Sequence, residues 1–147
     1  MDKLGLGRKM EQAVMRRWEW YGFRTWQPAR AKYATQDLFG LFDFIAVKPY
    51  CPVNLVQVKR KRREEAERAL EAIKSFTELY HAPIAPFVVL WHQERVADGN
   101  CSGKPCDDQG DCEHCGMADG KTNVIVFEAW ELGLLGWMQA EQWSEKA

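Results

Sequence analysis

The sequence predicts a mixed α/β domain, in which a central sheet contains parallel and antiparallel strands and helices cover its faces. Three observations support this class. The 147 residues are enough for one sizeable core, and 46% apolar residues with 12% aromatics exclude a disordered chain. Helical and strand-like periodicities follow one another in the order α-β-β-β-α-β-β-α. We therefore expect a single domain over residues 1–147.

The first half of the chain predicts one helix followed by three strands. Apolar side chains recur every three or four residues from 7 to 22, as on one face of a helix that Gly22 ends. A short strand is expected at 23–26. Two β-like runs, 39–48 and 53–60, are separated by a short proline-flanked turn and predict a β-hairpin.

The second half predicts a long helix, two strands and a final helix. The helical pattern begins after the hairpin and breaks at Pro83. An apolar run at 86–92 is typical of a buried strand, and 122–127 predicts another. Residues 128–143 are expected to form a short aromatic-rich helix that two glycines interrupt. Between the two strands, residues 98–121 form a cysteine-rich insertion with few other apolar residues.

Charge is distributed unevenly along the chain. Residues 1–63 carry 14 Lys and Arg against 5 Asp and Glu, a net charge of +9. Residues 64–147 carry 6 against 16, a net charge of −10, so the overall charge of −1 is the sum of two opposed halves. This asymmetry is typical of a chain that contacts nucleic acid through its basic part.

The distribution of apolar residues predicts neither a membrane span nor a signal peptide. No apolar run approaches the roughly 18 residues that span a bilayer, and the first residues lack the apolar core of a signal peptide. We expect an intracellular, cytoplasmic protein without a membrane partner, encoded by a cell or a phage. Four of the five cysteines crowd into residues 101–115, which favours metal ligands over a secreted disulfide framework.

Polar side chains interrupt the apolar pattern of the predicted hairpin at three positions. Gln57 and Lys59 share one face of the second strand, roughly 7 Å apart. Asp43 lies on the first strand. A connection with an odd number of residues, such as three or five, places Asp43 on the same face, whereas an even number does not. The parity of the connection is therefore the main structural condition on a shared site.

A carboxylate, an amide oxygen and an ammonium group beside apolar strands require partners, because burying them unpaired costs free energy. Metal-assisted phosphodiester cleavage supplies a reason for their convergence. Mg²⁺ (or Mn²⁺) prefers oxygen ligands, which Asp43, the Gln57 side chain and the backbone carbonyl of Val58 offer. Lys59 is expected to orient the attacking water or to stabilise the charge of the transition state. Glu11, at the edge of the buried stripe of the first helix, completes the metal's shell.

These residues resemble the PD-(D/E)XK nuclease superfamily, and within it the archaeal-type Holliday junction resolvases and their phage relatives. The resemblance covers Gly7 to about Trp91: a helix with a glutamate, a hairpin whose first strand carries the aspartate in an Asp-Phe-Ile-Ala context, and a second strand at the place of the family's acid-x-Lys pattern. It implies a restriction-endonuclease-like fold and a Mg²⁺-dependent endodeoxyribonuclease, with Glu11, Asp43 and Lys59 at the family's functional positions. Gln57 departs from the pattern, because the family usually has Glu or Asp there, although some members carry Gln.

Each candidate also has an ordinary structural interpretation. Asp43 would then be a polar residue at a strand edge, and the polar positions of the second strand would form the solvent face of the hairpin. Against this, Val53 and Leu55 share the parity of the polar positions. This face therefore begins apolar and turns polar only where the motif lies. Glu11 is either a ligand or an exposed helix glutamate.

Basic side chains surround these candidates. The charge run that begins at Lys59 is followed by glutamates, and one interpretation is i,i+4 pairing on a helix surface. Beside a nuclease site, contact with the phosphate backbone is favoured. Trp18, Trp20 and Trp26 either stack on unpaired bases or pack in the core. The candidate DNA-binding residues are Arg16, Arg17, Arg30, Lys32, Arg60, Lys61, Arg62 and Arg63.

The cysteine-rich insertion supplies four soft ligands within fifteen residues. Tetrahedral Zn²⁺ would order a segment that cannot form its own core, so we predict a structural zinc site. Disulfides and an iron–sulfur cluster are the alternatives, and His114 is a substitute ligand. The four cysteines are Cys101, Cys106, Cys112 and Cys115.

Three functional hypotheses follow. The first is a Mg²⁺-dependent endonuclease that resolves four-way DNA junctions as a homodimer, since two symmetric cuts need two active sites. The second is a less selective nuclease of the same fold, acting in phage replication, restriction or repair. The third is a non-catalytic DNA-binding module that has lost activity at Gln57. The dimer surface is expected at Phe39, Phe42 and Phe44 or at the tryptophan-rich C-terminus.

Overall fold

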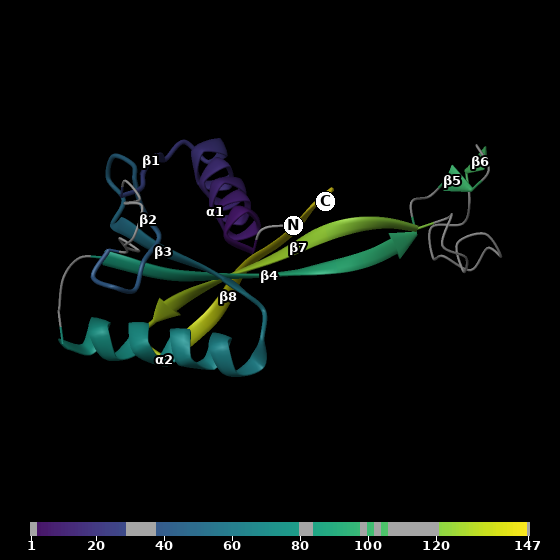
Figure 1. Ribbon diagram of the computed structural model, residues 1–147. Helices are drawn as coiled ribbons and strands as arrows, with labels where there is room; N and C mark the ends of the chain where they lie inside the picture. The colour runs from purple at the N-terminus through teal and green to yellow at the C-terminus, as the bar shows by residue number, and fades with distance from the viewer. Residues whose placement is uncertain are drawn as a thin grey trace. The chain divides into compact units, whose positions relative to one another are not determined.

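The computed structural model is a mixed α/β fold in which two helices flank a six-stranded mixed sheet (Figure 1). It describes residues 3–28, 38–79, 84–97, 100–101, 104–105 and 121–146. Within these residues the strand order of the sheet is β1-β2-β3-β4-β7-β8, and β5 and β6 form a separate two-stranded pair. The elements are α1 (Lys3–Trp20), β1 (Arg24–Trp26), β2 (Phe44–Val47), β3 (Val53–Arg60), α2 (Arg63–Leu79), β4 (Ile84–Ala97), β5 (Asn100–Cys101), β6 (Lys104–Pro105), β7 (Lys121–Gly133) and β8 (Gly136–Lys146).

Helix α1 packs its apolar stripe on one face of the sheet. The ring of Trp18 makes edge-on contacts with Phe44 (5.9 Å between centroids) and Phe87 (5.3 Å), so Trp18 is a core residue. Gly22 follows the helix with φ +94°, a left-handed conformation that favours glycine, and it ends the helix as predicted. The buried side chains of this stripe recur every three or four residues: Met10, Ala13, Val14 and Trp18.

Strands β2 and β3 form the predicted hairpin. Their antiparallel register pairs Phe44 with Val56, and the connection of five residues, 48–52, is odd. This odd connection is the one that the parity condition requires. Regular pairing runs from Ala46–Asn54 to Phe44–Val56, and Asp43 lies just before the strand.

The first of these strands is shorter than the sequence predicts. The expected strand over 39–48 begins only at Phe44, because the chain turns just before it. Phe39 (φ 56°) and Gly40 (φ 70°) are both left-handed, and the Leu38 N–H bonds to the Phe42 carbonyl at 2.8 Å. This turn packs Phe42 into the core in place of a longer β ladder.

Helix α2 connects β3 to the parallel strand β4 and covers the face opposite α1 (Figure 1). Its buried side chains follow the predicted helical period, and Ile73 near the centre of the helix is fully buried. The buried cluster beneath α2 consists of Phe42, Leu55, Ala66, Ile73, Val88 and Leu90. Because β3 alternates its side chains between faces, Leu55, Gln57 and Lys59 all lie on the α2 side.

The expected C-terminal helix is wrong. Residues 128–143 belong to strands β7 and β8, which are joined by a turn at Leu134 and Leu135. The two glycines that looked like helix interruptions flank this turn instead. Gly136 has φ +114°, which an L side chain rarely adopts, so glycine is required where the chain reverses.

Two of the three phenylalanines proposed for a dimer surface are buried within the chain. Phe42 and Phe44 are fully buried, so the expectation that they form an exposed interface is wrong, whereas Phe39 is exposed. In the C-terminal region, Trp143 is buried and Trp137 is partly buried. These two tryptophans therefore contribute mainly to the interior.

The chain divides into two compact units. One contains Met1–Trp91 with Glu128–Gln142, and the other contains His92–Phe127 with Trp143–Ala147. All site candidates of the hairpin and both helices belong to the first unit. None of the helices in the described ranges is long and apolar enough to cross a membrane.

Candidate active site at the carboxyl end of β3

Gln57 and Lys59 lie near the carboxyl end of β3, on the face that α2 covers. The parallel register with β4 places Gln57 beside Val88 and Lys59 beside Leu90, and both of these apolar side chains are buried. Leu55 precedes them on the same face and is also buried. Gln57 and Lys59 are themselves half-buried, so this end of the strand is not an ordinary solvent face.

Asp43 meets β3 where the two strands of the hairpin separate. Its Oδ2 accepts a hydrogen bond from the Val58 N–H at 2.7 Å, and its own N–H donates to the Val56 carbonyl at 2.8 Å. In a longer β2, a backbone carbonyl would accept the hydrogen bond from the Val58 N–H. Here the Asp43 carboxylate accepts it instead. Asp43 therefore contacts the backbone of β3 at Val56 and Val58, on either side of Gln57.

The side-chain oxygen Oε1 of Gln57 is buried and has no hydrogen-bond partner in the part of the chain that the structure describes. Leaving a buried polar atom unpaired costs about 1–3 kcal/mol. Nearly all such atoms in native proteins are paired, and an exception calls for an explanation such as a catalytic role or a bound ion. Other buried polar atoms, such as His92 Nδ1 and Trp130 Nε1, also lack a hydrogen-bond partner among the described residues, but the Gln57 oxygen is the one that belongs to the β3 motif with Lys59.

The backbone carbonyl of Val58 points toward the same place. In a strand, the N–H and C=O of one residue face the same neighbouring strand. Because the Val58 N–H is directed at Asp43, its carbonyl also faces the Asp43 side. Three oxygen donors of different kinds, a carboxylate, an amide and a carbonyl, thus belong to adjacent positions of the hairpin.

Glu11 approaches from the opposite helix. Although charged, it is only 8% exposed, and its Oε2 accepts a hydrogen bond from Gln27 Nε2 at 2.7 Å. It lines a hollow of about 360 Å³ together with Val58 and Lys59. The interpretation of Glu11 as an exposed helix glutamate is therefore wrong, because this carboxylate is buried next to the end of β3.

The candidates form two sets that meet at Lys59. Gln57 and Lys59 line one hollow, and Glu11, Val58 and Lys59 line another. Within the described residues, no three Asp, Glu, His or Cys side chains gather closely enough to hold a metal ion. A cation here would depend on the amide and carbonyl oxygens as well as on carboxylates. Such a donor set suits a hard cation, and the unpartnered Gln57 oxygen leaves room for one ligand bond.

Glu65 is a site candidate that the sequence reasoning missed. It lies in the first turn of α2 and lines both hollows, beside Lys59 in each. Its nearest ion-pair partner, Arg62, is 3.9 Å away, and the Glu65 side chain is about half exposed. The signal was the short link between β3 and α2, which brings the first turn of the helix back to the end of the strand.

Several of the predicted DNA-binding side chains have protein partners. Lys61 Nζ lies 2.9 Å from the carboxylate of Glu128. Arg17 is paired with Glu141, and this hydrogen bond raises the pKa of the Arg17 guanidinium. Both cations are therefore partly neutralised by β7 and β8, and they are weaker candidates for phosphate contact than their sequence positions indicate.

The remaining basic candidates are more exposed. Arg62 and Arg63 lie 3.9 Å and 3.8 Å from glutamates of α2, which is the weak surface pairing that the charge run allows. The Arg60 guanidinium lies over the Trp91 ring, 5.4 Å from its centroid. Arg16 is exposed on α1. Arg30 and Lys32 lie outside the described residues.

The zinc prediction falls largely outside the described residues. Cys106, Cys112 and Cys115 lie there, and the backbone of Cys101 belongs to the short strand β5. Cys51 is an exposed free cysteine in the β2–β3 turn. The structural zinc site stays a prediction, which metal analysis of the purified protein would test.

Comparisons with protein-family models, with curated proteins and with solved structures found no significant match to this chain. The residues themselves therefore carry the functional assignment.

Proposed function

We propose that this protein is a metal-dependent DNA endonuclease with its active site at the carboxyl end of β3. The observation that carries the proposal is the buried, unpartnered Oε1 of Gln57, which belongs to the residue between the two β3 positions that Asp43 contacts and lies two residues from Lys59. Oxygen donors beside an ammonium group suit a divalent cation and the phosphate that it binds.

Each residue has a defined role in this proposal. Asp43, Gln57 and the Val58 carbonyl hold Mg²⁺ or Mn²⁺, and Glu11 and Glu65 are the nearby carboxylates that offset the charge that Gln57 lacks. The bound metal supplies polarisation of the phosphate and a lower pKa for a coordinated water. Lys59 donates hydrogen bonds to a phosphate oxygen and stabilises the negative charge of the transition state.

The substrate is branched DNA, cut by a two-fold dimer. This part of the proposal follows from the resemblance to Holliday junction resolvases over Gly7 to Trp91. The excess of +9 charges in residues 1–63, which contain Asp43, Gln57 and Lys59, supports a polyanionic partner. A less selective nuclease with the same site would cut linear duplex and four-way junctions equally well.

Cleavage of a four-way junction and of a matched linear duplex, each with Mg²⁺ or Mn²⁺, tests the proposal. Asp43→Asn keeps an acceptor for the Val58 N–H but removes the charge, and Lys59→Ala removes the ammonium. Both are expected to abolish cleavage, while Lys146→Ala, an exposed change at the other end of the chain, keeps it. Equal activity in all four proteins, or no cleavage by the wild type, would overturn the assignment.

A non-catalytic DNA-binding module is the second candidate, and the neutral side chain at Gln57 favours it. Metal affinity falls when a carboxylate ligand is replaced by an amide, because the charge attraction is lost. This candidate predicts salt-sensitive DNA binding without cleavage under any metal. Cleavage that appears only in Gln57→Glu would show that the carboxylate alone is missing.

A further inference from the structure

The turn between β7 and β8 exposes two adjacent leucines. Leu134 and Leu135 are 105% and 99% exposed, so neither packs against its own chain. Turns of this length usually carry Gly, Asn, Asp or Ser, whose side chains suit the turn conformation or bond to its backbone. Leucine offers neither advantage, and here Gly136, with φ +114°, provides the conformational freedom. The two side chains therefore serve neither the core nor the turn.

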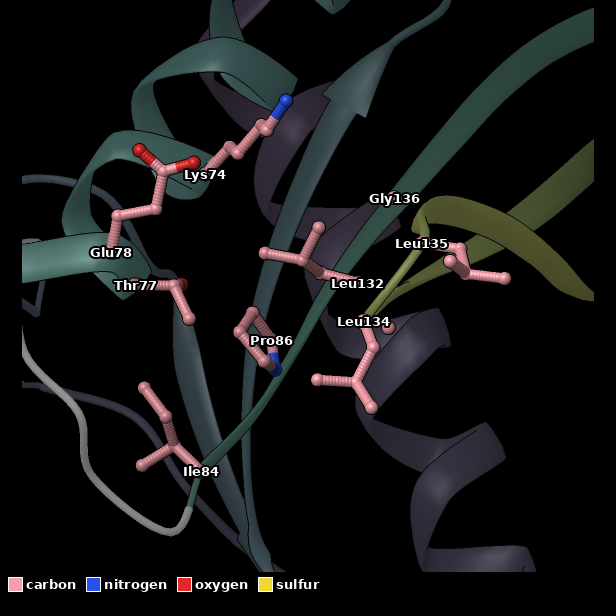
Figure 2. Close-up of a pocket in the computed structure, with 10 residues that line it drawn as sticks. Lys74, Thr77, Glu78, Ile84, Pro86, Leu132, Leu134, Leu135 and Gly136 are labelled. Atoms are coloured by element: carbon pink, nitrogen blue, oxygen red, sulfur yellow. The ribbon is translucent and has the colours of Figure 1, made fainter.

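An apolar hollow lies directly beside this turn. Its volume is about 560 Å³, and Ile84, Pro86 and Leu132 line it, with Leu134 and Leu135 of the turn at its rim. Figure 2 shows these side chains between the end of α2 and the turn, with Leu135 extending away from Ile84 and Pro86. A chain therefore cannot fill its own hollow with Leu135 in this conformation.

Further apolar side chains are exposed on the same elements. Leu79 is the last residue of α2, and Met138 follows the turn in β8. Monomeric proteins seldom expose several large apolar residues on adjoining elements, and such patches usually mark interaction sites. The hairpin-tip patch, as we call it, consists of Leu79, Leu134, Leu135 and Met138.

Two opposite charges border the hollow. Lys74 and Glu78 are exposed, lie one helical turn apart on α2, and have no ion-pair partner within the described residues. When a two-fold axis places two copies of α2 antiparallel, Lys74 of each copy lies opposite Glu78 of the other. The pair is therefore self-complementary in charge, as an isologous interface requires.

We propose that the hairpin-tip patch binds a second copy of this chain in a two-fold dimer. In this arrangement the leucines of each turn enter the hollow of the other copy, and Lys74 and Glu78 pair across the axis. The projection and the hollow occur on one surface, so two identical surfaces are complementary and the contact closes at two copies. This dimer would supply the two-fold symmetry in the proposed function, but its contacts use none of the residues at the end of β3, so loss of the dimer and loss of cleavage can be measured separately.

Sedimentation equilibrium of the full chain tests this proposal. The wild type is expected to dimerise, and the double substitution Leu134→Asn with Leu135→Asn to raise the dimer dissociation constant at least tenfold. Tyr50→Asn is the matched control, since Tyr50 is also a fully exposed apolar residue in a hairpin turn, between β2 and β3. Neither leucine is buried, so the variants are expected to fold as the wild type does. Urea unfolding verifies this.

Charge reversal provides the second arm. Lys74→Glu is expected to weaken the dimer by placing two like charges opposite each other, and adding Glu78→Lys is expected to restore it. A wild type that stays monomeric up to its solubility limit would overturn the proposal. So would a dimer that the leucine substitutions leave intact, or a charge-reversed double variant that does not recover.

Discussion

The surroundings of the two ends of helix α2 differ in which side chains show unusual burial or exposure. The helix has 17 residues, so its ends are about 24 Å apart. Beside its first half, Gln57 and Lys59 are half-buried, and Gln57 Oε1 is buried without a partner among the described residues. Near its last turn, apolar groups are exposed, including Leu79 and the turn leucines.

Folding alone favours neither arrangement. A buried amide oxygen without a partner destabilises the fold, and an exposed leucine contributes nothing to the core. The two proposals assign a polar, charged ligand to the first end and an apolar surface to the second. In this molecule, a buried polar atom and exposed leucines indicate binding sites more strongly than the presence of a hollow does.

The largest expected effect is on strand cleavage, which substitutions at the two ends of α2 should change differently. Asp43→Asn is expected to lower the rate of strand cleavage by about 10³-fold or more, because the proposed metal loses a charged ligand. The double leucine substitution at the hairpin tip is expected to leave nicking of single strands intact but to uncouple the paired cuts of a junction. Supercoiled cruciform plasmid distinguishes the outcomes, since nicked and linear products separate on a gel.

One result would contradict this prediction. If the hairpin-tip variant loses nicking as completely as Asp43→Asn, the two ends do not act independently and the comparison is wrong.

The next effect concerns the middle of α2, which supports both ends. Ile73 is fully buried, and Ile73→Ala is expected to lower the free energy of unfolding by about 2–5 kcal/mol through lost burial and a cavity. Urea unfolding measures the change. Ser75→Ala, an exposed change on the same helix, serves as control. A loss smaller than that of the control would mean that α2 does not pack as described.

A smaller effect of opposite sign is expected at Gln57. In the absence of divalent metal, Gln57→Leu should raise the free energy of unfolding by about 1–3 kcal/mol, because it removes a buried unpaired oxygen. The same variant should lose any stabilisation by Mg²⁺ or Mn²⁺, which follows from ligand binding to the folded state. Gln12→Leu, at an exposed position of α1, is the control. A less stable Gln57→Leu protein would show that the oxygen is satisfied.

The smallest effect lies on the solvent side of α2. Arg63 and Glu67 are 3.8 Å apart and both side chains are largely exposed. Glu67→Gln should change the free energy of unfolding by less than about 0.5 kcal/mol, since water and salt screen such pairs. Thermal unfolding at low and high salt checks this. A larger change in the free energy of unfolding would show that Glu67 has a structural role, contrary to its exposure.

Local patterns predicted most of the first ninety residues. The helix that ends at Gly22, the hairpin strand 53–60 and the buried strand beginning near residue 86 all follow from periodicity and from glycine or proline breaks. The odd connection between β2 and β3 was stated as a condition and is confirmed, because turn length and side-chain parity are linked by geometry.

The C-terminal region shows where local patterns fail. Its aromatic residues and two glycines fit an interrupted helix as well as a hairpin, and short apolar segments do not distinguish the two by period alone. Neighbouring strands decide the matter, since β7 pairs with β4 and with β8 and so satisfies its backbone in the sheet. Glu65 was missed for a related reason: its proximity to Lys59 depends on how α2 returns over β3.

The sequence by itself determined the order of most elements, the shared face of Gln57 and Lys59 and the basic character of the first half, because periodicity and charge are local properties. Only the tertiary structure decided that Gln57 Oε1 is buried without a partner among the described residues, that Glu11 is buried, and that two leucines project from a turn beside a hollow. Burial and exposure depend on what packs against a residue, and those neighbours come from distant parts of the chain.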